Sequence, residues 1–167
     1  MIYPFYCFLP DLLVYILISY LLLKRKFSLD KFFFLFFLGL ILYLTLFPLI
    51  YNLFFLGKHE VNPYNFYPFI DLINNMAGTS TKVTAIKEIF LNIFLYFPAS
   101  FFGYKLFKQN KTKVFMTFVL LSCLIEAVQP QLSQYRRGDI TDVITNAFGS
   151  LLALFVYLIY SKLTNKD

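Results

Sequence analysis

Residues 140–161 have the sequence ITDVITNAFGSLLALFVYLIYS, and this stretch decides the fold class. A hydrocarbon core about 30 Å thick is crossed by roughly 20 predominantly apolar residues in a helix, and this stretch meets that requirement. Polar and small residues share one helical face and bulky apolar residues the other, which is typical of a helix packed inward on one side and facing lipid on the other. The predicted inward face holds Asp139, Asp142, Asn146, Gly149, Ser150 and Ala153.

Four further apolar stretches lie earlier in the chain, at residues 6–23, 32–51, 86–104 and 114–133. Each is long enough to cross a bilayer as a helix. We therefore predict one all-α domain over residues 1–167, an integral membrane bundle of about five transmembrane helices in contact with the lipid bilayer. The long segment 52–85 is predicted to be an extracellular loop, which either covers the bundle as a lid or simply connects two helices.

The composition agrees with a membrane protein, because 59% of the residues are hydrophobic and only 14% are charged. The net charge of +6 does not indicate nucleic-acid binding, since the basic residues fall in short segments between apolar stretches. Ten of the fifteen lysines and arginines follow the first and third stretches or the last one. The positive-inside rule then places the N-terminus outside and the C-terminus in the cytoplasm.

Ionisable residues at membrane depth are costly and are functional candidates by default. Glu126 is the clearest case, and it shares a helical face with Ser122, Gln129 and Ser133 because their spacings are four, three and four. The alternative is a structural role, in which Glu126 is protonated or held by a neighbouring helix.

Further charged residues lie at the start of the last apolar stretch, at about the same membrane depth as Glu126. Asp139 and Asp142 suit a helix N-terminus, where capping alone explains both acids. Capping does not explain Asn146, which lies one turn deeper on the same face. Arg136 and Arg137 precede Asp139, either as ordinary loop charges, as ion-pair partners of the acids, or as donors to a phosphate or carboxylate ligand.

These observations define a candidate site at the outer ends of the helices. Glu126, Asp139 and Asp142 are also catalytic candidates, because they could bind a divalent cation or act as a general base. The lone histidine, His59, has no companion that would indicate a zinc site. The predicted ligand-binding residues are Asn92, Glu126, Gln129, Arg136, Arg137, Asp139, Asp142 and Asn146.

Five short motifs follow one another along the chain: YLTLFP at 43–48, NFYPF at 65–69, NIFLYFP at 92–98, SCLIEAVQ at 122–129 and RGDITDVITNAFG at 137–149. In this order they resemble the motifs of the VanZ-like family of membrane proteins. One departure is that Ala99 and Ser100 follow Pro98, where the family usually has a glycine two positions after the proline.

The resemblance implies a protein of the bacterial plasma membrane that contributes to tolerance of teicoplanin and other glycopeptide or lipoglycopeptide antibiotics. In the first hypothesis, it binds or modulates a lipid-linked cell-wall precursor, or the drug, at the outer leaflet. In the second, it is an enzyme acting on a lipid-linked phosphate through its acidic residues. In the third, it is an accessory to lipid or small-molecule transport in which Glu126 carries a proton.

Overall fold

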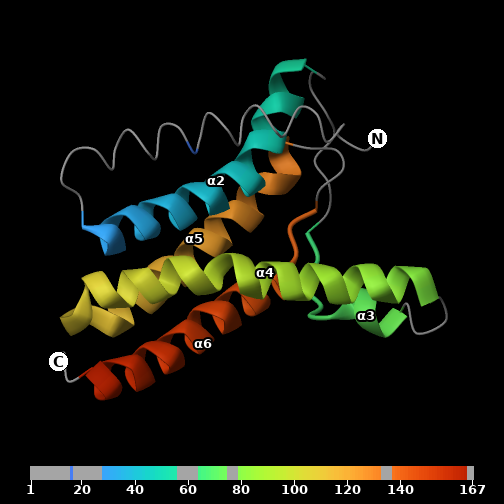
Figure 1. The fold of residues 1–167 in the computed structure, drawn as a ribbon. Coiled ribbons are helices and arrows are strands. Elements are labelled where there is room, and N and C mark those ends of the chain that lie inside the picture. The colour runs from blue at the N-terminus through green and yellow to red at the C-terminus, as the bar shows by residue number, and fades with distance from the viewer. Residues whose placement is uncertain (1–15, 17–27, 56–63, 75–78, 133–136, 165–167) are drawn as a thin grey trace.

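The computed structural model describes residues 16, 28–55, 64–74, 79–132 and 137–164 (Figure 1). In this part of the chain the secondary structure is helical apart from one isolated β-bridge, which confirms the all-α class. Helix α4 packs most extensively against α6 and also contacts α2, while α5 packs against α6. The elements are α2 (Leu29–Phe55), α3 (Ile70–Asn74), α4 (Thr79–Leu106), the 3-10 helix η2 (Lys108–Asn110), α5 (Lys111–Leu132) and α6 (Ile140–Thr164).

Three segments of the described chain are long and apolar enough to cross a membrane: Val83–Leu106, Lys108–Gln131 and Ile140–Thr164. They contain most of the stretches predicted at 86–104, 114–133 and 140–161. The stretch predicted at 32–51 lies within α2. The stretch at 6–23 lies outside the described residues except for Ile16, so the total of five transmembrane helices stays a prediction.

Helices extend from both sides into the segment predicted as the outer loop, residues 52–85. Helix α2 continues to Phe55, and α4 already begins at Thr79, seven residues before the apolar stretch that predicted it. The reason is that hydropathy marks where side chains leave the apolar layer, whereas helical hydrogen bonding can continue into water. Between the two helices, residues 64–74 include the short helix α3, which packs against α4.

One end of the bundle gathers basic residues. The end of α4 and the start of α2 meet there through an ion pair between Lys105 Nζ and Asp30 Oδ1 at 2.6 Å. Lys105 also lies over the ring of Tyr160 near the end of α6, 5.2 Å from the ring centroid. Lys108 and Lys111, which join α4 to α5, belong to the same end. This grouping agrees with the predicted charge pattern, while the side of the membrane that this end faces stays a prediction.

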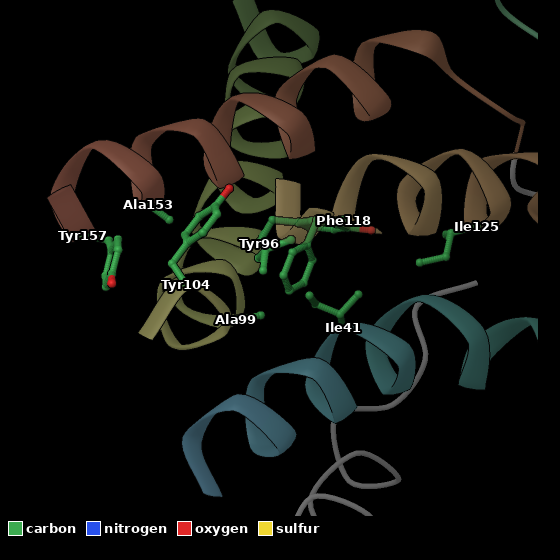
Figure 2. Close-up of a cluster of buried hydrophobic side chains, with 9 residues drawn as sticks. Ile41, Tyr96, Ala99, Tyr104, Phe118, Ile125, Ala153 and Tyr157 are labelled. Carbon is green, nitrogen blue, oxygen red and sulfur yellow. The ribbon is translucent and has the colours of Figure 1, made fainter. Parts of the chain in front are cut away.

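The α4–α6 contact depends on small side chains. A Cβ atom added at Gly149 would lie 2.5 Å from the backbone oxygen of Ile93, so only glycine allows this approach of the two helices. Ala99 on α4 and Ala153 on α6 are completely buried. Figure 2 shows aromatic side chains filling the space around them, including Tyr96 and Phe118.

The two faces predicted for α6 are confirmed. Asn146, Gly149, Ser150 and Ala153 are buried. Most of the bulky residues on the other side are exposed, as expected for side chains that face lipid. They include Ile144, Phe148, Leu151 and Phe155.

We expect Gly149→Ala to lower the free energy of unfolding by about 1–3 kcal/mol, because overpacking against a backbone atom forces the helices apart. Thermal unfolding of the detergent-solubilised protein would measure the change. Gly103→Ala is the matched control, since its added Cβ would approach only side-chain atoms of Phe34, Val114 and Phe118, at 3.2 Å or more. Equal losses in both variants would contradict the close-contact interpretation.

Candidate functional site

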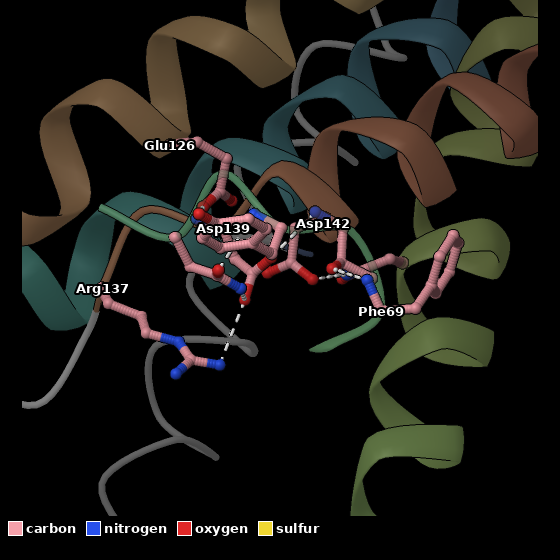
Figure 3. Close-up of polar contacts among 9 residues, drawn as sticks. Phe69, Glu126, Arg137, Asp139 and Asp142 are labelled. Atoms are coloured by element: carbon pink, nitrogen blue, oxygen red, sulfur yellow. Dashed lines mark hydrogen bonds and ion pairs between the residues drawn. The ribbon is translucent and has the colours of Figure 1, made fainter. Parts of the chain in front are cut away.

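Asp139 stands at the point where the chain enters α6, and it makes hydrogen bonds with both its backbone and its side chain. Its Oδ1 accepts from the backbone N–H of Thr141 at 2.8 Å, the arrangement of a helix cap. Its backbone N–H donates to Oε2 of Glu126 on α5 at 2.9 Å. The predicted cap is therefore present, and a second carboxylate from another helix binds the same turn. Figure 3 shows these acids close together.

A segment far earlier in the chain completes the surroundings of Asp139. Asn65 pairs with it as a parallel β-bridge, in which Asn65 N–H donates to Gly138 O at 2.8 Å and Ile140 N–H donates to Asn65 O at 3.0 Å. The side-chain amide of Asn65 also donates to Asp139 Oδ2 at 2.9 Å. The predicted site residues did not include Asn65, although the NFYPF motif that contains it was the available signal.

Two further contacts hold this segment against the bundle. The backbone N–H of Phe69, which adopts a positive φ of 57°, donates to Thr141 Oγ1 at 2.9 Å. The hydroxyl of Tyr64 donates to the backbone oxygen of Ala127 on α5 at 2.9 Å. Residues 64–69 therefore pack on the start of α6 and the last turns of α5, the two helices that carry Asp139 and Glu126.

Gly138 allows the strand-like approach beside Asp139. A Cβ atom added there would lie 2.5 Å from the backbone oxygen of Glu126 and 2.7 Å from Cδ1 of Tyr64. Any side chain at this position would push the loop away from α5. The glycine thus lets the backbone of Asp139 reach the carboxylate of Glu126.

The second acid, Asp142, links α6 to α4. Its Oδ1 accepts from the side-chain amide of Asn92 at 2.7 Å, and the same amide lies 3.4 Å from Thr145 Oγ1. One turn deeper, the amide of Asn146 donates to Ser122 Oγ on α5 at 2.9 Å. The polar residues predicted on separate stretches are therefore joined by hydrogen bonds across three helices.

The three acids and the asparagines of α4 and α6 line a cavity of about 800 Å³. Seven of the predicted binding residues line it, and Arg136 lies outside the described residues. The list of predicted ligand-binding residues did not include Thr45, Glu88 or Tyr96. The full lining is Leu44, Thr45, Glu88, Leu91, Asn92, Phe94, Leu95, Tyr96, Ile125, Glu126, Gln129, Arg137, Asp139, Asp142 and Asn146.

Asp139 is held in its charged form. Burial raises the pKa of its carboxyl, but hydrogen bonds from Asn65 and Thr141 and the charge of Arg137 together outweigh burial, so the pKa lies below the ordinary value of 3.8. Arg137 Nη2 lies 3.2 Å from Asp139 Oδ2, an ion pair visible in Figure 3. The arginine side chain is more exposed than the aspartate it pairs with.

The acids of the site are acceptors of hydrogen bonds from other parts of the chain. Each of the three acids predicted as catalytic accepts a hydrogen bond from an N–H group of the chain itself. Within the described residues, no group of three or more histidine, cysteine, aspartate or glutamate side chains is placed to bind a metal ion. The arrangement suits recognition of a ligand by a polar surface that is already fixed.

Comparison with known proteins identifies the family. The model of the VanZ/LLP1 family matches residues 34–161, which include every hydrogen-bonded residue of the site described above. The chain therefore belongs to the VanZ/LLP1 family, as the five motifs indicated. No curated protein and no solved structure shows a significant match to the chain.

The lowered pKa of Asp139 predicts a pH-dependent contribution to stability. A carboxyl whose pKa is lower in the folded protein stabilises it fully above the unfolded value, here 3.8, and loses this effect as pH falls through the folded pKa. We expect Asp139→Asn to be less stable than the natural chain at pH 7 and to lose less stability on acidification below about pH 4. Thermal midpoints measured between pH 7 and pH 3 would check this, and parallel curves for the two proteins would contradict it.

Proposed function

We propose that this member of the VanZ/LLP1 family binds a lipid-linked component of the cell wall, or the antibiotic directed against it, in the cavity beside Asp139. Binding there would underlie tolerance of glycopeptide and lipoglycopeptide antibiotics. The observation that carries the proposal is a cavity of about 800 Å³ with a mixed polar and apolar lining, whose polar groups are joined by hydrogen bonds. This volume lies within the range of about 300–1,000 Å³ that is usual for small-molecule sites.

The apolar part of the lining supports a ligand that is partly lipid. Leu91 and Phe94 line the cavity from α4 and are 67% and 69% exposed. Leu44 and Thr45 line it from α2, so the cavity reaches the bundle surface between these two helices. In a membrane this surface faces acyl chains, and a lipid-linked ligand can place its head among the polar groups and its chain along the apolar rim.

The proposed orientation puts the cavity on the outer side. The basic end of the bundle, around Lys105 and Lys108, is assigned to the cytoplasm by the positive-inside rule. The starts of α4 and α6 and the end of α5 form the opposite end, where Asp139 and Glu126 lie. Lipid-linked wall precursors and the antibiotics that bind them meet on that side of the plasma membrane.

The hydrogen bonds within the site favour binding. Asn65, Thr141 and Arg137 hold Asp139, and Asn92 holds Asp142. A site fixed in this way loses little conformational freedom when a ligand binds, which increases affinity.

We expect Thr45→Trp to abolish saturable binding of a purified lipid-linked peptidoglycan precursor or of teicoplanin, because the indole occupies part of the cavity. Teicoplanin tolerance of cells should fall to the level of cells lacking the gene, at unchanged protein abundance. Leu42→Trp is the matched control, since Leu42 is an exposed residue of the same helix outside the cavity lining. Undiminished binding and tolerance in Thr45→Trp would overturn the cavity as the binding site.

A further inference from the structure

A second cavity, of about 350 Å³, lies at the basic end of the bundle. Among the described residues it shares no lining side chain with the cavity beside Asp139. Helix α2 contributes Phe34 and Leu38, and the connection between α4 and α5 contributes Phe107 and Asn110. The rings of Phe34 and Phe107 meet edge to face, with their centroids 6.0 Å apart. The remaining wall of this basic-end cavity comes from α5.

The wall formed by α5 runs from the polar layer into the apolar layer of the membrane. Lys113, Thr117 and Leu121 line it and lie on one face of the helix, because they follow at intervals of four. The first and last of them are about 12 Å apart along the helix axis. In the apolar segment Lys108–Gln131, Lys113 is near the start and Leu121 near the middle. The basic-end cavity therefore has one end beside the headgroups and the other within the hydrocarbon.

The deep part of the basic-end cavity offers a ligand almost no polar contact. A Cβ atom added at Gly103 of α4 would lie 3.2 Å from both Phe34 Cε2 and Val114 Cγ1, so α4 packs closely against these walls. The hydroxyl of Thr117 already donates to the backbone oxygen of Lys113 at 2.8 Å. A polar group buried here would lose its hydrogen bonds to water, whereas a hydrocarbon chain loses none. This part suits an acyl chain.

The end of the basic-end cavity near the polar layer is cationic. Lys113 is exposed, and no carboxylate belongs to the described lining. Lys105 at the same end of the bundle is paired with Asp30, but among the described residues Lys113 forms no ion pair. Helix α5 has no acid in its first turn, although acids are favoured at that position. With Lys108 and Lys111 nearby in the chain, this end attracts an anion.

We infer that the basic-end cavity binds an anionic phospholipid of the bilayer, with its phosphate at Lys113 and one acyl chain extending along α5 toward Leu121. A phosphate oxygen can accept from the ammonium group of Lys113 and from the side-chain amide of Asn110. Basic pockets between transmembrane helices are a common form of anionic-lipid site. The assignment depends neither on the function proposed for the cavity beside Asp139 nor on the side of the membrane that the basic end faces.

The experiment measures lipid binding to the purified full-length chain in detergent by native mass spectrometry and equilibrium titration. The probes are short-chain phosphatidylglycerol, phosphatidylcholine with the same acyl chains, and glycerol 3-phosphate. We expect phosphatidylglycerol to bind about fivefold more tightly than phosphatidylcholine, the preference that one lysine near a membrane surface produces. Phosphatidylcholine should still saturate the site, because its chain fits the same apolar wall. Glycerol 3-phosphate, which has no chain, should bind at least about tenfold more weakly than phosphatidylglycerol.

Four substitutions at exposed positions test the two halves of the basic-end cavity without threatening folding. Lys113→Gln should make the two lipids bind equally, whereas Lys162→Gln, at the same end of the bundle but outside the lining, should keep the preference. Thr117→Trp should abolish saturable binding of both lipids, because the indole occupies the space of the acyl chain. Leu120→Trp is its control, since Leu120 is 58% exposed on the same helix and does not line the basic-end cavity.

Several results would overturn the inference. Equal affinities of the two lipids for the natural chain, or equal losses of preference in Lys113→Gln and Lys162→Gln, would mean that no local anion site exists. Lipid binding undiminished by Thr117→Trp, or glycerol 3-phosphate binding as tight as that of phosphatidylglycerol, would show that the apolar wall is not used. Saturable binding of none of the probes would leave the basic-end cavity to another part of the chain or to a second copy, and would exclude a lipid site.

Discussion

The carboxylate of Asp139 is the constraint on which the rest of the site depends. It lies at the edge of an apolar bundle, where an unsatisfied charge is strongly unfavourable. Its oxygens accept from Asn65, Thr141 and Arg137. Satisfying this one group therefore fixes three things together: the start of α6, the position of the segment around residue 65, and the placement of the arginine at the cavity wall. The backbone N–H of Asp139 also donates to the carboxylate of Glu126, which holds α5 against the start of α6.

The packing of α4 on α6 places the second half of the site. Gly149 lets α6 approach the backbone of Ile93, and the neighbouring residue, Asn92, then reaches Asp142 across the contact. The close approach at Gly149 and the Asn92–Asp142 hydrogen bond lie within about two helical turns of each other. A loss of packing at Gly149 would therefore displace the side chains that line the cavity. Small residues at this contact thus serve the site as well as the stability of the bundle.

The sequence was most informative where the helical period orders side chains. The buried face of α6 and the Ser122, Glu126 and Gln129 face of α5 follow from spacing alone, because a helix repeats every 3.6 residues. Which faces meet is not encoded in a local period, so the pairing of Asn92 with Asp142 and of Asn65 with Asp139 needed the folded structure. The asparagine at 65 was visible only as part of a family motif, since a β-bridge between residues so far apart has no local signal. The helices α2 and α4 are longer than the predicted apolar stretches for a different reason, because hydropathy marks only the apolar part of a helix.

The proposed function requires the end of the bundle that carries Asp139 to face the outside of the cell. Single cysteines introduced by Gln131→Cys, near that end, and by Asn110→Cys, near the basic end, test this directly once Cys7 and Cys123 have been replaced by serine; both sites are exposed. A membrane-impermeant thiol reagent applied to intact cells should label the cysteine at position 131 and leave the one at position 110 unlabelled until the cells are opened. Labelling at position 110 but not at 131 in intact cells would place the acid-lined cavity on the cytoplasmic side and contradict the account.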